Sequence, residues 1–169
     1  RMGFDEVYDT CTGADITVIE EANEFVDRLT KGENLPLFTS CCPAWVQFLE
    51  KKYPEFLPNL SSCKSPMSMF ASVIKTYQKE NDVAPGKKYY HVGIMPCTAK
   101  KFEAQRDELK TDGVPDTDIV ITTQELIKMI RESGILFDQL LSESVDMPFG
   151  EMSGAAVIFG VTGGVTEAV

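Results

Sequence analysis

The strongest constraint on this chain is a pair of adjacent cysteines, Cys41 and Cys42, at a point where a strand should give way to a helix. An apolar run that ends at Phe38 precedes them, and Pro43 opens a segment with helical spacing. Such a turn directs backbone N–H groups and the positive end of a helix dipole at the thiols, which favours thiolates. The pair predicts metal-bound sulfur or a nucleophile, with half-buried structural cysteines as the alternative.

A second cysteine, Cys97, has a similar position at the end of an apolar run. Lys100 and Glu103 follow it with the i, i+3 spacing of neighbours on one face of a helix. On a surface, such an ion pair contributes little to stability. Beside a buried anion, the lysine would instead donate a hydrogen bond and offset negative charge. Both readings of the pair follow from the sequence.

Three ionisable side chains share one stripe of a predicted helix, at i, i+3 and i+7: Glu21, Glu24 and Arg28. Most stripes of this kind are solvated faces with an internal ion pair. If the stripe is buried instead, we expect burial to raise the pKa of a carboxyl group in it.

The spacing of apolar, capping and turn residues predicts alternating helices and strands. The predicted helices span 15–29, 43–52, 66–77 and 123–133, and the predicted strands span 89–95, 119–122 and 155–165. Ser65 and Pro66 suit the start of the third helix, and Thr122 with Glu125 forms a capping box for the fourth. This alternation implies right-handed crossovers and a parallel sheet.

Length, composition and charge limit the classes of protein to which this chain can belong. A chain of 169 residues buries roughly 70% of its unfolded surface, enough for a real core. No apolar run approaches the ~20 residues of a membrane span, and no signal peptide is recognisable, so we expect no membrane association. A net charge of -10 argues against nucleic acid. Five cysteines indicate free or metal-bound thiols in a reducing compartment, and one histidine, His91, excludes a zinc site with two histidines.

Together, the TSCCP segment at 39–43 and the MPC-x-x-K-x-x-E segment at 95–103 resemble the active-site signatures of the iron-only (FeFe) hydrogenases. Other stretches that look like this family's catalytic domain are 13–15, 20–26, 64–66, 118–126 and 159–165. The resemblance therefore covers essentially the whole chain, and two cysteine motifs in this order are highly specific.

The resemblance implies an α/β domain with a largely parallel sheet flanked by helices, one lobe of the hydrogenase catalytic domain. It implies reversible reduction of protons to molecular hydrogen at an H-cluster. In that family a 4Fe–4S cubane held by four cysteines is joined to a two-iron subcluster with CO, CN and a bridging dithiolate. Thiolates are soft anionic donors that suit such clusters.

The resemblance also implies a role for individual residues. Cys42 and Cys97 match two cubane ligands, and Cys41 matches an uncoordinated cysteine that donates a proton. The residues that match a proton relay to Cys41 are Arg28, Glu24, Ser61 and Glu21. The residues that match positions around the cofactor are Ser65, Pro66, Met95, Lys100 and Glu103, with Lys100 as the cyanide partner that Glu103 orients.

Some features depart from the family pattern. Met67 stands where the family often has glutamine, which changes the hydrogen bonding near the iron ligands, and Ala44 replaces a common glycine. The other two cubane cysteines and a further wall of the pocket have no match here. We therefore expect residues 1–169 to be a partial H-cluster domain, truncated at both ends and inactive alone. Cys11 and Cys63 match no ligand, so we expect an incidental thiol and a core residue.

The expected partners are ferredoxin or another low-potential electron carrier and the H-cluster maturation proteins. The expected location is the cytoplasm of an anaerobic organism, with the periplasm as the alternative. A non-catalytic hydrogen sensor or iron–sulfur assembly relative is the competing function. A thiol-dependent hydrolase or oxidoreductase is disfavoured, because His91 is the only histidine and no C-x-x-C pair exists.

Overall fold

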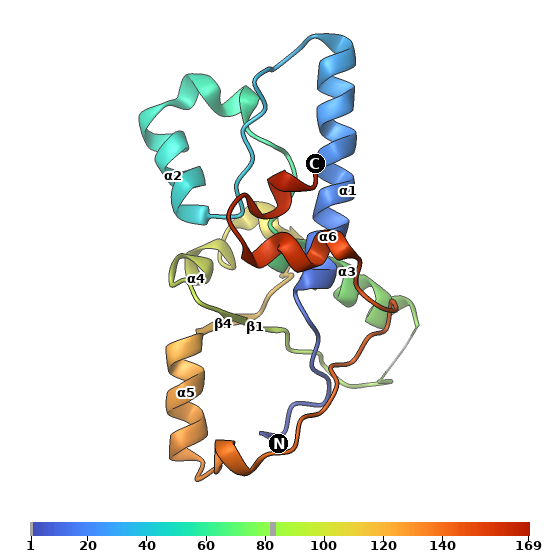
Figure 1. Ribbon diagram of the computed structural model, residues 1–169, viewed down its shortest axis with the longest axis vertical. Coiled ribbons are helices and arrows are strands. Elements are labelled where there is room, and N and C mark those ends of the chain that lie inside the picture. Colours follow the sequence, from blue (N-terminus) through green and yellow to red (C-terminus); the bar gives the residue numbers. More distant parts are fainter. Residues whose placement is uncertain (1, 82–83) are drawn as a thin grey trace.

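The computed structural model describes residues 2–81 and 84–169, and its elements are arranged as in Figure 1. The α-helices are α1 (Cys11–Lys31), α2 (Pro43–Lys52), α3 (Pro66–Glu80), α4 (Ala99–Glu103), α5 (Thr123–Glu132) and α6 (Gly154–Val157). The strands are β1 (Val92–Met95), β2 (Lys110–Thr111), β3 (Val114–Pro115) and β4 (Ile119–Thr122). Short 3-10 turns cover Pro54–Asn59, Asp107–Leu109, Phe137–Gln139, Ile158–Gly160 and Gly164–Glu167.

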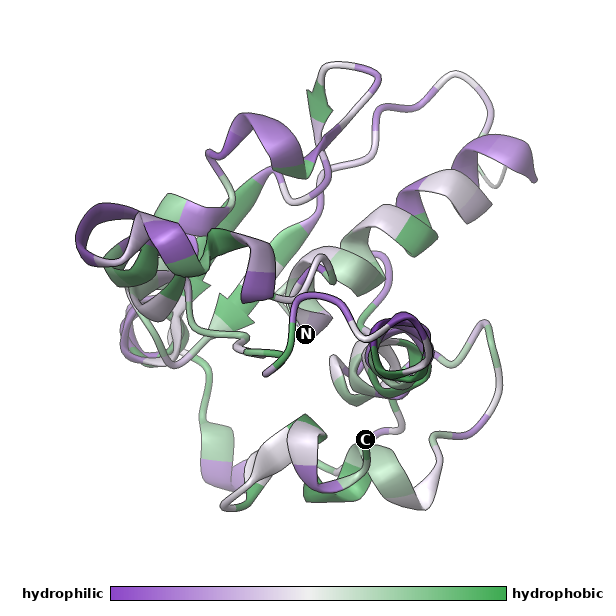
Figure 2. Ribbon diagram, turned by 90° about the horizontal axis from the view of Figure 1, so that it is seen from above, coloured by the Kyte–Doolittle hydropathy of each residue, from purple (hydrophilic) through white to green (hydrophobic). Residues whose placement is uncertain are grey.

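The sheet that positions the second cysteine motif is parallel. β1 pairs with β4, with Val92 opposite Ile119 and Met95 opposite Thr122. The strands are hydrophobic along most of their length (Figure 2), as expected for strands covered by helices. β2 and β3 form a separate antiparallel pair. The predicted α/β class with a parallel sheet is confirmed. β1 begins at Val92 and is therefore shorter than the strand predicted for 89–95.

α1 crosses α3 at Gly13, where a Cβ atom would lie 2.2 Å from the carbonyl oxygen of Pro66. This close approach requires glycine, because any side chain would collide with backbone. Ala14 beside it is fully buried. The helix therefore begins at Cys11, and the predicted start at Asp15 is wrong. Packing of small residues against α3 extends α1 by one turn.

Two other helix starts follow their local sequence. The Ser65 side chain caps α3 by accepting from the Ser68 N–H, and Pro66 follows at the first helical position. Thr122 and Glu125 form the predicted capping box of α5. At the other end of α1, Gly32 has a φ of 68°, a left-handed conformation that ends the helix.

Fewer apolar side chains of α2 are buried than its sequence suggests. Leu49 is buried, but Trp45 and Phe48 remain 38% and 46% exposed. Their rings pack against each other with centroids 5.9 Å apart, and Phe48 also contacts Tyr53. Of these three apolar residues, only Leu49 is buried in the protein interior.

The predicted strand at 155–165 is wrong. This segment forms α6 and two 3-10 turns that lie along α1, in the red part of the ribbon in Figure 1. Ser153 caps α6, and its backbone N–H donates to Asp15 on α1 over 2.7 Å. Ala156 is fully buried. A small buried residue and a cap favour a helical turn here, although the segment is rich in the β-branched residues typical of strands.

None of the helices in the described part of the chain combines the length and the apolar character that a membrane crossing requires.

Candidate functional site

A cavity of about 170 Å³ lies where α1, the turn before α2, the loop into α3 and the C-terminal turns meet. Four predicted site residues line it: Glu21, Cys41, Ser65 and Pro66. The other lining residues are Thr17, Thr39, Ser40, Cys63, Lys64, Phe159, Gly163, Gly164, Val165 and Thr166. The first cysteine motif and the carboxylate stripe of α1 therefore reach one common space.

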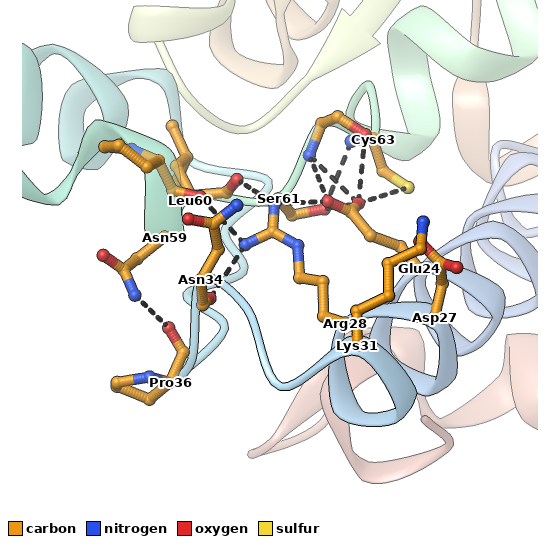
Figure 3. A network of polar contacts seen from close by, with 12 residues as sticks. Glu24, Asp27, Arg28, Lys31, Asn34, Pro36, Asn59, Leu60, Ser61 and Cys63 are labelled. Carbon is orange, nitrogen blue, oxygen red and sulfur yellow. Dashed lines mark hydrogen bonds and ion pairs between the residues drawn. The ribbon is translucent and has the colours of Figure 1, made fainter.

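The stripe of α1 is part of a hydrogen-bonded network with the loop at 60–63 (Figure 3). The Ser61 hydroxyl donates to Glu24 Oε2 over 3.1 Å and lies near enough to Glu21 to influence its pKa. Arg28 pairs with the Glu24 carboxylate through Nη2. The same guanidinium donates to the carbonyl oxygens of Pro58 and Leu60 at 3.0 and 2.8 Å. Ser61 thus contacts Glu24 directly and lies close to Glu21.

The two carboxyl groups differ in electrostatic environment. Burial raises the pKa of Glu21, and the charge of Glu24 raises it further, while the hydrogen bond from Ser61 opposes the shift. Burial also acts to raise the pKa of Glu24, but hydrogen bonds from Ser62, Arg28 and Ser61 outweigh it and lower that pKa. The expectation of a raised carboxyl pKa is confirmed for Glu21 and wrong for Glu24. The pKa of Glu24 is lowered because several hydrogen-bond donors converge on its carboxylate.

Sequence reasoning missed Ser62. Its backbone N–H lies 3.2 and 3.0 Å from the two Glu24 carboxylate oxygens, and its hydroxyl donates to Oε2 over 3.1 Å. The Ser61-Ser62-Cys63 run offered a signal, because three successive polar or sulfur side chains follow a loop that faces a charged helix. Ser62 is exposed and Glu21 is buried, so the network runs from the surface to the cavity.

Cys63 also differs from its prediction as a core residue. Its side chain is half-buried, lines the cavity, and places Sγ 3.7 Å from Glu24 Oε2. Burial raises the pKa of this thiol to about 11, and neighbouring carboxylates contribute in the same direction. Cys63 therefore remains a thiol at neutral pH and donates toward Glu24.

The Lys100–Glu103 pair is buried, which excludes the surface ion pair. Lys100 Nζ lies 2.6 Å from Glu103 Oε2 and 2.7 Å from the carbonyl oxygen of Cys41. Glu103 also accepts from the hydroxyls of Ser65 and Ser68, the latter over 2.7 Å. The pair therefore joins the start of α4 to the first cysteine motif and to the start of α3.

The thiols lie on two turns that Lys100 connects, because its backbone N–H also donates to the Cys97 carbonyl over 3.3 Å. Cys42 is exposed at the start of α2, Cys41 is exposed beside it, and Cys97 is half-buried. Soft thiol donors on two linked turns beside a cavity fit part of the ligand set of an iron–sulfur cluster. Within residues 2–81 and 84–169, no group of three or more His, Cys, Asp or Glu side chains is arranged around a metal position.

Not every predicted residue reaches the cavity itself. Outside its lining lie Glu24, Arg28, Cys42, Ser61, Met95, Cys97, Lys100 and Glu103. Lys100 and Glu103 are linked to it through Cys41 and Ser65, which do line it. Met67 is buried in α3, with its sulfur 3.0 Å from the position of a Cβ atom at Gly93 in β1. Met67 therefore packs α3 on the sheet.

The family model described as "Iron only hydrogenase large subunit, C-terminal domain" matches residues 1–169, and the chain belongs to this family. Iron hydrogenase 1 of Clostridium pasteurianum is 49% identical over 168 residues, which are 99% of this chain and 29% of that protein. A cytosolic Fe-S cluster assembly factor of Sclerotinia sclerotiorum is 37% identical over 150 residues, 83% of this chain and 26% of that protein.

Solved structures agree with these sequence comparisons. An apo [FeFe]-hydrogenase from Chlamydomonas reinhardtii has a TM-score of 0.85 and 48% identity, over 98% of this chain and 42% of that one. The chain thus spans less than half the length of each of these relatives.

Proposed function

We propose that this chain forms part of the catalytic site of an iron-only hydrogenase, which reversibly reduces protons to molecular hydrogen. The observation that carries the proposal is the hydrogen bond from Ser61 to Glu24, one helical turn from Glu21, which lines the cavity together with Cys41. It links a hydrogen-bonded network at the surface to the cavity that Cys41 lines. The identity to a named iron hydrogenase over nearly the whole chain supports the same function.

In this proposal Cys42 and Cys97 each provide a thiolate ligand to the cubane of an H-cluster. The other two cubane cysteines lie outside residues 1–169. When bound, the cluster, with a 4Fe–4S cubane and a two-iron unit that carries CO, CN and a bridging dithiolate, supplies the electrons and the iron chemistry. Soft anionic sulfur is the donor that such a cluster requires.

The residues of α1 and the loop at 60–63 would move protons. The donors around Glu24 favour its ionised form, so that Glu24 accepts a proton from the surface. The Ser61 hydroxyl both donates and accepts, and can therefore pass a proton from Glu24 to Glu21. Glu21, whose pKa burial raises, retains the proton closer to neutral pH than an ordinary carboxyl group. It would return a proton to Cys41 Sγ, across the cavity that both side chains line, after this sulfur has given up its own.

The remaining site residues would hold the cofactor. A lysine ammonium has three donors, and Lys100 uses two of them on Glu103 and the Cys41 carbonyl. The third remains for a cyanide nitrogen, and Glu103 orients the group. Ser65 and Pro66 line the cavity from the start of α3, and Met95 ends β1 just before Cys97. We propose contact of these three residues with the two-iron unit.

A low-potential electron carrier such as ferredoxin would exchange electrons with the full-length protein, and H-cluster maturation proteins would load it. The second candidate function is iron–sulfur cluster assembly without hydrogen turnover. It is favoured by the 37% identity to a cytosolic assembly factor. The two candidates differ in their need for a fast proton path, which an assembly factor does not require.

The test is Cys41→Ala in the full-length, cluster-loaded protein. We expect hydrogen turnover to fall by at least about 100-fold, as on loss of a general acid, while iron content and the cubane spectrum stay unchanged. Cys11→Ala is the matched control, because Cys11 is a thiol on the same domain outside the cavity lining. Turnover that survives Cys41→Ala would contradict the role of Cys41, whereas a loaded, unmodified protein that evolves no hydrogen would favour an assembly role.

A further inference from the structure

The loop from Leu60 to Ser65 forms one wall of the cavity and carries the link in the carboxylate network. Its first half is held by α1, through the bonds of Arg28 to the Leu60 carbonyl and of Ser61 to Glu24. Its last residue, Ser65, is held by Glu103. Lys64 lies between these two anchors and provides a third contact. Its partner belongs to a part of the fold that has no role in the proposed function.

The third anchor is an ion pair with a fully buried partner. Lys64 Nζ lies 2.7 Å from Asp116 Oδ2, and the Asp116 side chain is 1% exposed. Thr111 donates to the other carboxylate oxygen over 2.7 Å, so both oxygens of Asp116 have a partner. The Asp116 backbone carbonyl lies 3.1 Å from His91 Nδ1. Asp116 is thereby fixed to the β2–β3 pair and to the start of β1.

We infer that Asp116 is a positioning residue: through Lys64, it holds the loop so that Ser61 keeps its hydrogen bond to Glu24 and its place beside Glu21. This inference rests on the proposed proton relay and adds to it a residue 52 positions away from Lys64 in the sequence.

Two observations favour positioning over stabilisation alone. Lys64 lies three residues from Ser61, and each peptide unit is rigid, so displacement of Lys64 is transmitted along a short segment. Cys63, Lys64, Ser65 and Pro66 are consecutive residues of the cavity lining. The ion pair therefore fixes this part of the cavity wall, in the same short loop as Ser61.

The test is an infrared measurement on the full-length, cluster-loaded protein, at a pH low enough that Glu21 carries its proton. The C=O stretching band of this carboxyl group is identified by its loss in Glu21→Gln. A carboxyl group that loses a hydrogen bond absorbs at higher frequency, so Ser61→Ala gives the reference shift. We expect Asp116→Asn and Lys64→Met to shift the band in the same direction, and Lys64→Arg, which keeps the cation, to restore it.

The matched control is Lys79→Met, which removes another ion pair of α3, that between Lys79 and Asp112, with side chains 77% and 75% exposed. This variant should leave the band in place. A band that moves in Ser61→Ala but not in Asp116→Asn or Lys64→Met would overturn the inference and leave the relay intact. A band that Ser61→Ala does not move would contradict the relay itself. If Asp116→Asn does not fold, Lys64→Met and its rescue by Lys64→Arg decide the question.

Discussion

Glu21 and Glu24 lie one turn apart on α1 and both interact with Ser61, yet their pKa values are displaced in opposite directions. Burial dominates at Glu21, whereas hydrogen-bond donors dominate at Glu24. Neighbouring titratable groups with separated pKa values are typical of acid–base sites, because one group holds a proton while the other accepts one. The difference arises from the loop at 60–63, which presents its donors to Glu24.

Glu21→Gln should make the stability of the protein less dependent on pH. The folded-state pKa of Glu21 is raised above its ordinary value of 4.5. The stabilising contribution of this group is therefore complete below that value and is lost as pH rises through the folded-state pKa. We expect the Tm of Glu21→Gln to exceed that of the unmodified protein at neutral pH, with the difference closing as pH falls. Glu20→Gln, on the exposed side of the same helix, should show no such trend in thermal scans.

Glu24→Gln should have the opposite sign. The folded-state pKa of Glu24 lies below its ordinary value of 4.5, so its contribution is present above that value and is lost as pH falls through the folded-state pKa. The variant also leaves Arg28 without its carboxylate partner. We expect a loss of about 1–3 kcal/mol at neutral pH, measured as a lower Tm. An unchanged Tm at neutral pH, or a loss that grows as pH falls, would contradict this assignment.

Lys100→Met should be strongly destabilising. The pair of Lys100 and Glu103 has side chains only 10% and 6% exposed, and removing one partner of a buried pair typically costs about 3–5 kcal/mol. The matched control is Lys128→Met, which removes an exposed pair with Glu132 and should change stability by less than about 1 kcal/mol. Equal effects of the two variants on Tm would show that the Lys100 pair is not buried in solution.

Gly13→Ala should separate α1 from α3. The added Cβ would lie 2.2 Å from the Pro66 carbonyl oxygen, and such overpacking typically costs about 1–3 kcal/mol. Since Ser65 and Pro66 line the cavity, the variant should also reduce cluster loading, measured as iron per chain. Gly160→Ala is the control, because a Cβ there has open space around it. Normal iron content in Gly13→Ala would contradict the role of this crossing.

The sequence predicts those parts of the fold that depend on local rules. Capping residues at Ser65 and Thr122 and the turn before Pro43 act within a few residues, so their positions follow from spacing alone. The start of α1 and the segment at 155–165 do not, because contacts between distant parts of the chain decide them. Gly13 is helical because α3 covers it, and Ala156 because it is buried in packing with α1.

The candidate site divides in the same way. The stripe of Glu21, Glu24 and Arg28 is visible as helical periodicity, and the resemblance adds Ser61 and the cysteines. The donors of Ser62 and the pairing of Lys64 with Asp116 join residues 38 and 52 positions apart. No period or motif encodes these contacts, so the lowered pKa of Glu24 could not be predicted from the sequence.

The proposed proton path to Cys41 is tested most directly by hydrogen evolution. The full-length, cluster-loaded protein carrying Glu21→Gln is compared with the same protein carrying Glu20→Gln. The glutamine keeps the size of the side chain but carries no transferable proton. We predict that turnover falls by at least about 100-fold, with unchanged iron content and cluster spectra, and that Glu20→Gln retains full turnover. Full turnover in Glu21→Gln would contradict the proposal that protons reach Cys41 through the network around Ser61.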